Sequence, residues 1–259
     1  MPPARALLYA VTLGVLIFVA RSVFIGPPRL WVAVAVCLAY AALFVTGVVF
    51  IKLRMFADAI VRGPARARGV ALTFDDGPHP VFTRKVLDCL DSKKVQATFF
   101  VIAKKAEEHP ELVREILLRG HGVGLHSYAH DRLFSLRAPS SIKKDLARGI
   151  AALETICGER PRLFRPPIGH TTPAIARVAD ELDLAIVGWS VSGVDGVAGA
   201  DAERVAARVR AGLSDGAIIA LHDSPERGER EPAGVAALPS ILTAIAARGL
   251  EVMPLARWV

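Results

Sequence analysis

Two adjacent carboxylates, Asp75 and Asp76, end an apolar run that begins at Val70. A glycine and a proline follow them, and these residue types favour a turn. The run therefore predicts a buried strand whose carboxyl end carries both acids. Because α/β barrels place their chemistry at the carboxyl ends of their strands, the pair is a candidate for metal binding and proton transfer. An acidic turn that only ends a strand is the alternative.

Two histidines, His126 and His130, follow another short apolar run at a spacing of i and i+4. Two imidazoles and one carboxylate could hold a divalent cation and leave positions open for water and substrate, as hydrolytic zinc sites require. The spacing alone is a weak signal. The acidic pair and His222, which ends a further apolar run, strengthen it, because one acid could bind metal while the other serves as a base.

Two more charged residues follow predicted strands and could tune these groups. A buried Arg165 beside the base would hold that base ionised and fix its direction. Asp195 could do the same for His222, keeping it protonated as a general acid.

The elements that must position these residues are seven predicted strands that alternate with helices. The strands are Val70–Phe74, Ala97–Ile102, Val123–His126, Arg162–Phe164, Leu184–Trp189, Ala217–Leu221 and Leu250–Met253. Regular alternation indicates parallel strands joined by crossover helices. No Gly-x-Gly-x-x-Gly follows the first strand, which argues against a dinucleotide fold. The predicted fold is α/β, a distorted seven-stranded (β/α) barrel in which ionisable residues at five strand ends converge on one face.

In five segments of matching order and spacing, the chain resembles the polysaccharide deacetylases, the NodB-homology group of carbohydrate esterase family 4. The segments are Thr73-Phe74-Asp75-Asp76-Gly77-Pro78, His126-Ser127-x-x-His130, Arg165-Pro166-Pro167, Asp195 and Leu221-His222. The first two segments together are highly specific, and the others are weaker singly. The match covers roughly Val70 to Val259.

The resemblance implies an enzyme that removes N-acetyl groups from amino sugars with a divalent metal. Zinc is the usual metal, with Co²⁺, Ni²⁺ or Mn²⁺ as alternatives. By motif position, the metal ligands would be Asp76, His126 and His130. Activated by the metal, water would lose a proton to Asp75 and attack the amide carbon, and His222 would protonate the departing amine.

The remaining motif positions have supporting roles in this family. Arg165 would orient Asp75, and Asp195 would tune His222. On the substrate side, the oxyanion would meet the backbone N–H of Ile168, and the pocket would include Pro166 and Leu221.

Two positions depart from the family pattern. Ile168 stands where a tyrosine is usual, which keeps the backbone N–H but loses an aromatic contact to sugar. Gly196 stands where tryptophan often follows the aspartate, so the packing around the acid must differ. Trp189 is expected in the core, and the charged loop Glu226–Glu231 is expected in solvent or at a substrate rim.

The first 55 residues are predicted to form two transmembrane helices, at about 6–24 and 30–51. Leu30 to Ile51 contains no charge over 22 residues, long enough to cross a bilayer. The first segment also has the layout of a secretory signal peptide. A helical hairpin that turns at Gly26-Pro27-Pro28 is favoured, because no small-residue cleavage site follows near Ala20. Residues 56–68 read as a basic linker, and 69–259 as the deacetylase-like domain.

The chain carries a net charge of +7, and basic residues gather after the second apolar segment at Lys52, Arg54, Arg62, Arg66 and Arg68. This pattern favours contact with anionic lipid, and no nucleic-acid motif accompanies it. The positive-inside rule places the catalytic domain in the cytoplasm. Most members of the resembling family act outside, on cell-envelope polymers. The three cysteines are unclustered and predict no disulfide framework.

These observations lead to one main hypothesis and two alternatives. The main one is a membrane-anchored, metal-dependent deacetylase of an amino-sugar polymer or a lipid-linked saccharide. The first alternative is a deformylase or other N-deacylase of a lipid-linked sugar. The second is a non-catalytic, saccharide-binding membrane protein. The partners are thus a saccharide and membrane lipid, without nucleic acid, and the sequence does not indicate an oligomeric state.

Overall fold

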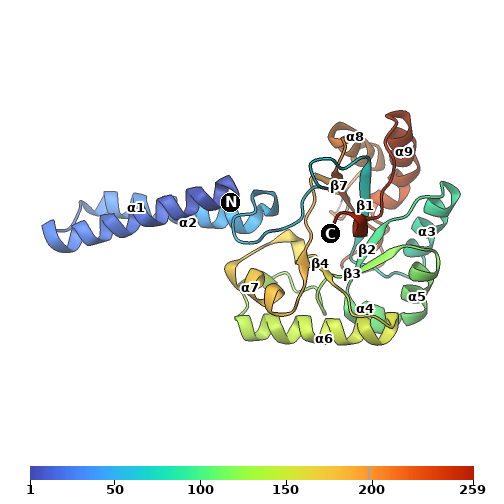
Figure 1. The fold of residues 1–259 in the computed structure, drawn as a ribbon, viewed down its shortest axis with the longest axis horizontal. Coiled ribbons are helices and arrows are strands. Elements are labelled where there is room, and N and C mark those ends of the chain that lie inside the picture. The colour runs from blue at the N-terminus through green and yellow to red at the C-terminus, as the bar shows by residue number, and fades with distance from the viewer. Residues whose placement is uncertain (198) are drawn as a thin grey trace.

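The structure is a computed structural model that describes residues 1–197 and 199–259. It consists of a pair of long N-terminal helices and an α/β domain (Figure 1). The helices α1 (Pro3–Ile25) and α2 (Leu30–Val49) lie side by side and extend away from the domain. The Thr12 and Tyr40 hydroxyl oxygens, 3.0 Å apart, link them. Both helices are long and apolar enough to cross a membrane, by length and composition.

Seven parallel strands form the centre of the domain, in the order β5-β4-β3-β2-β1-β7-β6. They are β1 (Val70–Asp75), β2 (Thr98–Val101), β3 (Gly122–Leu125), β4 (Leu163–Phe164), β5 (Ala185–Ile186), β6 (Val191–Ser192) and β7 (Ala217–His222). Every residue of β1 is buried, as expected for a central strand covered on both faces. The sheet curls into a half-barrel (Figure 1).

Helices cover the outer face of this sheet. They are α3 (Phe82–Ser92), α4 (Ala103–Glu108), α5 (Pro110–Leu118), α6 (Pro139–Cys157), α7 (Pro173–Glu181), α8 (Ala202–Gly212) and α9 (Ala233–Ala247), with short 3₁₀ turns η1 (Ile51–Leu53), η2 (Phe134–Leu136), η3 (Pro167–Gly169) and η4 (Leu255–Arg257). Local signals fix several ends. The Thr172 hydroxyl accepts the backbone N–H of Ile175 at the start of α7, and the Asp201 carboxylate caps α8 in the same way.

The opening of the half-barrel is filled by the segment that follows the hairpin. β5 and β6 are the two edge strands and follow each other in the chain, and no ladder joins them among the described residues. Between these edges, Ile60 pairs with Val187 and Arg62 pairs with Ala217. The segment predicted as a linker therefore contributes backbone hydrogen bonds to the sheet.

The elements of the structure differ from the predicted ones at several places. The expected strand Leu250–Met253 makes only a single bridge, between Val252 and Val70, because Pro254 follows and has no N–H to continue a ladder. The seventh strand of the sheet is instead β6, which was not predicted. Helix α4 was not predicted, because it follows β2 after one residue and has no side-chain cap. The second apolar helix ends at Val49, and η1 covers the remaining predicted residues.

Candidate active site

Parallel register brings the first and last strand ends together. On β1, Asp75 lies opposite Phe100 of β2 on one side and His222 of β7 on the other. The Asp75 carboxylate and the His222 imidazole therefore lie at the same level of the sheet, at its carboxyl edge. This is the convergence that the strand-end pattern predicts.

Arg165 lies inside the half-barrel and is fully buried. Its Nη1 donates to Asp75 Oδ1 at 2.6 Å and to the Thr73 hydroxyl at 2.8 Å. The Nε and Nη2 groups donate to the carbonyl oxygens of Val187 and Gly188. The guanidinium carbon lies 4.2 Å from the centre of the Phe100 ring. These contacts fix the direction of the Asp75 carboxylate, because the guanidinium group of Arg165 that binds it is itself held by three other hydrogen bonds.

Asp76, His126 and His130 form a compact cluster below the cleft. Asp76 Oδ1 lies 3.4 Å from Nε2 of His126 and 3.3 Å from Nε2 of His130. Potential ligand atoms of all three residues lie within 4.8 Å of one another, and all three residues are buried. His126 Nδ1 lies 2.7 Å from the carbonyl oxygen of Arg165, which accepts a hydrogen bond from Nδ1–H and leaves Nε2 free to bind a metal.

The cluster fits a divalent cation. Asp76 Oδ1 is buried and has no hydrogen-bond partner in the described part of the chain. An orphaned carboxylate oxygen that faces two imidazole nitrogens costs free energy unless a cation satisfies it. Burial tends to raise the pKa of Asp76, but the neighbouring histidines outweigh it and hold that pKa well below its usual range. One carboxylate and two imidazoles are a donor set that zinc accepts.

Backbone strain gathers around the same cluster. Asp76, Ser127, His130 and Ile168 all have positive φ angles, of 71°, 61°, 50° and 60°. For residues other than glycine, each such conformation costs on the order of 1 kcal/mol or more. The fold maintains them together at one place, which is typical of a functional site.

His222 and Asp195 form a second pair on the opposite side of Asp75. His222 Nδ1 lies 2.9 Å from Asp195 Oδ1, and its backbone N–H donates to Asp195 Oδ2. Burial lowers the pKa of His222, but the hydrogen bond and charge of Asp195, with the charges of Asp76 and Asp75, raise it to about 10. Gly196 lies against the ring, since a Cβ there would be 3.1 to 3.2 Å from three ring atoms.

A cleft of about 660 Å³ opens above these groups. Six of the predicted site residues line it: Asp75, Asp76, His126, His130, Ile168 and His222. Ile168 is 46% exposed there. Leu221 is not in the lining, because side chains alternate along β7 and its neighbours Ala220 and His222 face the cleft. Leu221 lies in the hydrophobic core instead, and Pro166 is buried at the start of the η3 turn.

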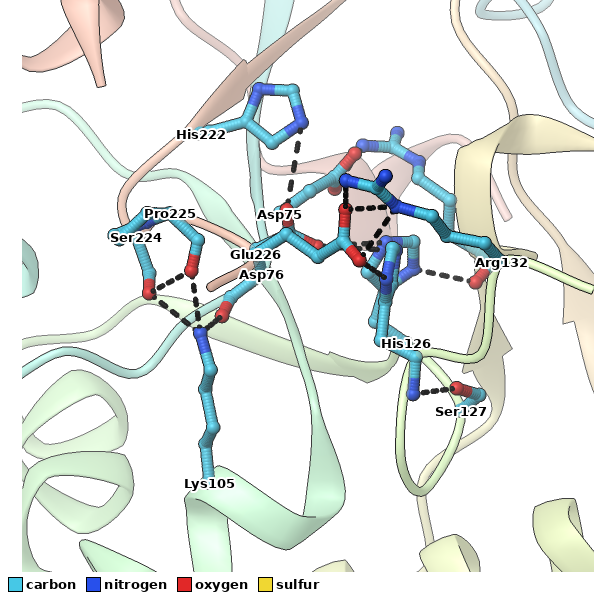
Figure 2. A network of polar contacts seen from close by, with 12 residues as sticks. Asp75, Asp76, Lys105, His126, Ser127, Arg132, His222, Ser224, Pro225 and Glu226 are labelled. Atoms are coloured by element: carbon cyan, nitrogen blue, oxygen red, sulfur yellow. Dashed lines mark hydrogen bonds and ion pairs between the residues drawn. The ribbon is translucent and has the colours of Figure 1, made fainter. Parts of the chain in front are cut away.

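Three further residues at the site, Trp189, Arg132 and Lys105, were not predicted to be there, whereas Glu226 belongs to the loop expected in solvent or at a substrate rim. Trp189, expected in the core, lines the cleft and packs so closely on Gly169 that a side chain at that position would collide with its ring. Arg132 and Glu226 also line the cleft. Lys105 of α4 lies behind it and donates to the carbonyl oxygens of Asp76 and Pro225 and to the Ser224 hydroxyl (Figure 2).

Lys105→Met should lower the free energy of unfolding by about 2 kcal/mol, because it leaves the partly buried carbonyl oxygens of Asp76 and Pro225 without this donor. The ammonium group lies 2.9 Å from Asp76 O and 2.7 Å from Pro225 O, and burial lowers its pKa. Urea unfolding of the full chain in detergent measures the change. Lys104→Met is the matched control, because Lys104 is exposed on the same helix. Equal losses for the two variants would contradict the structural role of Lys105.

Fold and site together define a hydrolase of the α/β half-barrel class with a candidate metal centre. The chain belongs to the polysaccharide deacetylase family. The family model described as "Polysaccharide deacetylase" matches residues 62–187. The matches to two curated relatives cover most of the length of each relative.

The chain is 36% identical over 197 residues to the chitooligosaccharide deacetylase of Bradyrhizobium sp. (strain ANU 289), covering 73% of this chain and 89% of that one. It is 33% identical over 193 residues to a peptidoglycan-N-acetylglucosamine deacetylase of Bacillus cereus, covering 74% of this chain and 69% of the relative. Among solved structures, the Bc1960 peptidoglycan N-acetylglucosamine deacetylase superposes with a TM-score of 0.70 at 32% identity, covering 76% of this chain and 91% of that one.

Proposed function

We propose that this chain is a metal-dependent hydrolase that removes N-acetyl groups from amino sugars of an oligosaccharide or polysaccharide. One observation supports this most directly. An acid–base pair, Asp75 and His222, flanks a cluster of one carboxylate and two imidazoles in a single cleft. The relatives named as deacetylases of chitooligosaccharide and peptidoglycan support an amino-sugar substrate.

The side chains of this chain divide the work of amide hydrolysis between them. When bound by Asp76, His126 and His130, a divalent cation supplies Lewis-acid polarisation of the amide carbonyl and of water. Asp75 takes a proton from water as the water oxygen attacks the amide carbon. Arg165 holds the accepting carboxylate in place.

The oxyanion and the leaving group need separate donors. In the described chain, the backbone N–H of Ile168 donates to no protein group, so we assign it to the oxyanion. His222 passes a proton from Nε2 to the amide nitrogen, because an amide anion is a very poor leaving group. Asp195 holds Nδ1 and thereby directs Nε2 toward the cleft, where it lies 3.9 Å from Asp76 Oδ2. The carbon–nitrogen bond then breaks to give acetate and a free amine.

We further propose that α1 and α2 form a transmembrane hairpin and that the catalytic domain lies on the cytoplasmic side. Arg5 near the start of α1 bonds Asp58 beyond the end of α2, so both outer ends of the hairpin lie at the domain. This adds Arg5 to the basic residues Lys52 and Arg54 on the same side, against Arg21 and Arg29 on the other. A compartment-specific reporter fused after Val259 tests the orientation.

The full chain, loaded with zinc in detergent, should release acetate from N-acetylated chito-oligosaccharides. A chelator should stop the release, and added Zn²⁺ should restore it, since the reaction needs the polarising cation. Acetate is measured directly, and bound metal is measured in the same sample. A metal-loaded chain that releases acyl groups from no acylated amino sugar would overturn the proposal and favour a saccharide-binding role.

A matched panel of N-acetyl and N-formyl sugars, free and lipid-linked, separates the main proposal from a deformylase. Faster formate than acetate release on the lipid-linked substrates would select the deformylase.

A further inference from the structure

The second imidazole of the metal cluster has an unmet hydrogen-bonding need. His130 directs Nε2 toward Asp76, at 3.3 Å from Oδ1. Its other ring nitrogen, Nδ1, is buried and has no hydrogen-bond partner among the described residues. A metal-binding histidine almost always donates its second N–H to a carbonyl, a carboxylate or water. His126 does so through the carbonyl oxygen of Arg165, so only His130 lacks such an acceptor.

A carboxylate stands next to that nitrogen. Glu226 Oε1 lies 3.7 Å from His130 Nδ1, longer than a hydrogen bond, and the Glu226 side chain is only 18% exposed. Arg132 holds the carboxylate from the solvent side, with Nε 2.9 Å from both Oε1 and Oε2 and Nη2 2.7 Å from Oε2 (Figure 2). A forked guanidinium contact of this kind fixes the plane of a carboxylate.

The loop that carries Glu226 is itself tied to the metal cluster. Lys105 binds the Ser224 hydroxyl and the Pro225 carbonyl, and the same ammonium group binds the carbonyl of Asp76. Glu226 is the next residue along this loop. The contacts therefore connect the backbone of one metal ligand with the side chain that faces another.

We propose that Glu226, oriented by Arg132, is the acceptor for the Nδ1–H of His130 and raises the affinity of the site for its metal. This inference rests on the metal centre of the proposed function. The carboxylate fixes the ring orientation and increases electron donation through Nε2, as acceptors of this kind do in known metal sites. Glu226 is a positioning residue, because it reaches the metal only through His130.

Glu226→Ala should weaken zinc binding roughly 10- to 100-fold, the usual effect of losing such an acceptor. Competition with a chromophoric chelator measures the dissociation constant of the full chain in detergent, without any substrate. Glu226→Gln keeps a neutral acceptor and should recover part of the loss. Glu229→Ala is the matched control, because its carboxylate lies on the same loop, is 90% exposed and pairs with His79. It should leave zinc affinity unchanged.

Arg132→Met separates orientation from simple charge. Removing a positive charge near a cation site should tighten zinc binding if Glu226 acts only through its field. It should weaken binding if Arg132 is needed to hold Glu226 against His130. Tighter binding by this variant, or unchanged binding by Glu226→Ala, would overturn the proposal while acetate release by the wild type stood. Absence of zinc binding by the wild type would instead remove the metal centre itself, and this inference with it.

Discussion

Asp75→Asn should reduce amide hydrolysis by a factor of roughly 10² to 10⁴, the contribution typical of a positioned general base. Asparagine has nearly the same shape and keeps an oxygen that can accept the hydrogen bond from Arg165 Nη1. It cannot take a proton from water. Because the metal cluster is built from Asp76 and two histidines, bound zinc should remain near the wild-type level. Initial rates of acetate release and metal analysis of the same preparation measure both quantities.

Asp180→Asn controls for the loss of a carboxylate, since Asp180 is exposed on α7, away from the cleft lining. This variant should keep full activity. Equal rates for metal-loaded wild type and Asp75→Asn would show that Asp75 is not the base. Loss of zinc from Asp75→Asn would show instead that Asp75 is a metal ligand.

Replacing both His126 and His130 by alanine should empty the metal site and abolish activity. The change leaves a single carboxylate, Asp76, and one carboxylate does not provide the three protein ligands that a hydrolytic zinc site needs. Metal analysis after dialysis should find no zinc in the double variant. Activity should not return on adding Zn²⁺, in contrast to the chelator-treated wild type.

His109→Ala is the control for this experiment, because His109 lies at the junction of α4 and α5 and pairs only with the exposed Glu111 in the described chain. It should bind zinc normally. A double variant that still holds one zinc per chain would place the metal elsewhere and contradict the assignment of His126 and His130.

Much of the fold and of the site follows from short-range patterns in the sequence. Each β–α unit has its own apolar period and turn residues, so the parallel sheet could be predicted from alternation alone. Parallel pairing then aligns strand ends, which is why Asp75 and His222 meet across β1 and β7. Family resemblance supplied the role of each residue.

The missed features depend on contacts between distant loops, which no local pattern encodes. Lys105 reaches Ser224 across 119 residues, and Arg132 reaches Glu226 across 94. Leu221 was predicted in the pocket but lies in the core, because successive side chains of β7 point to opposite faces and Ala220 is the one that faces the cleft. The expected last strand failed for a different reason, since one proline ends a ladder that the apolar pattern alone would continue.

In the opening of the half-barrel, Ile60 pairs with Val187 and Arg62 pairs with Ala217. These pairs limit where the chain can be truncated. Ile51 and Ala59 are 3% and 1% exposed and belong to the same hydrophobic core as the strands. We infer that a unit able to fold on its own must include the stretch that follows α2, from Ile51 onward. A fragment that starts at the first strand would leave the backbone at Val187 and Ala217 without these partners, and unpaired strand backbone is prone to self-association.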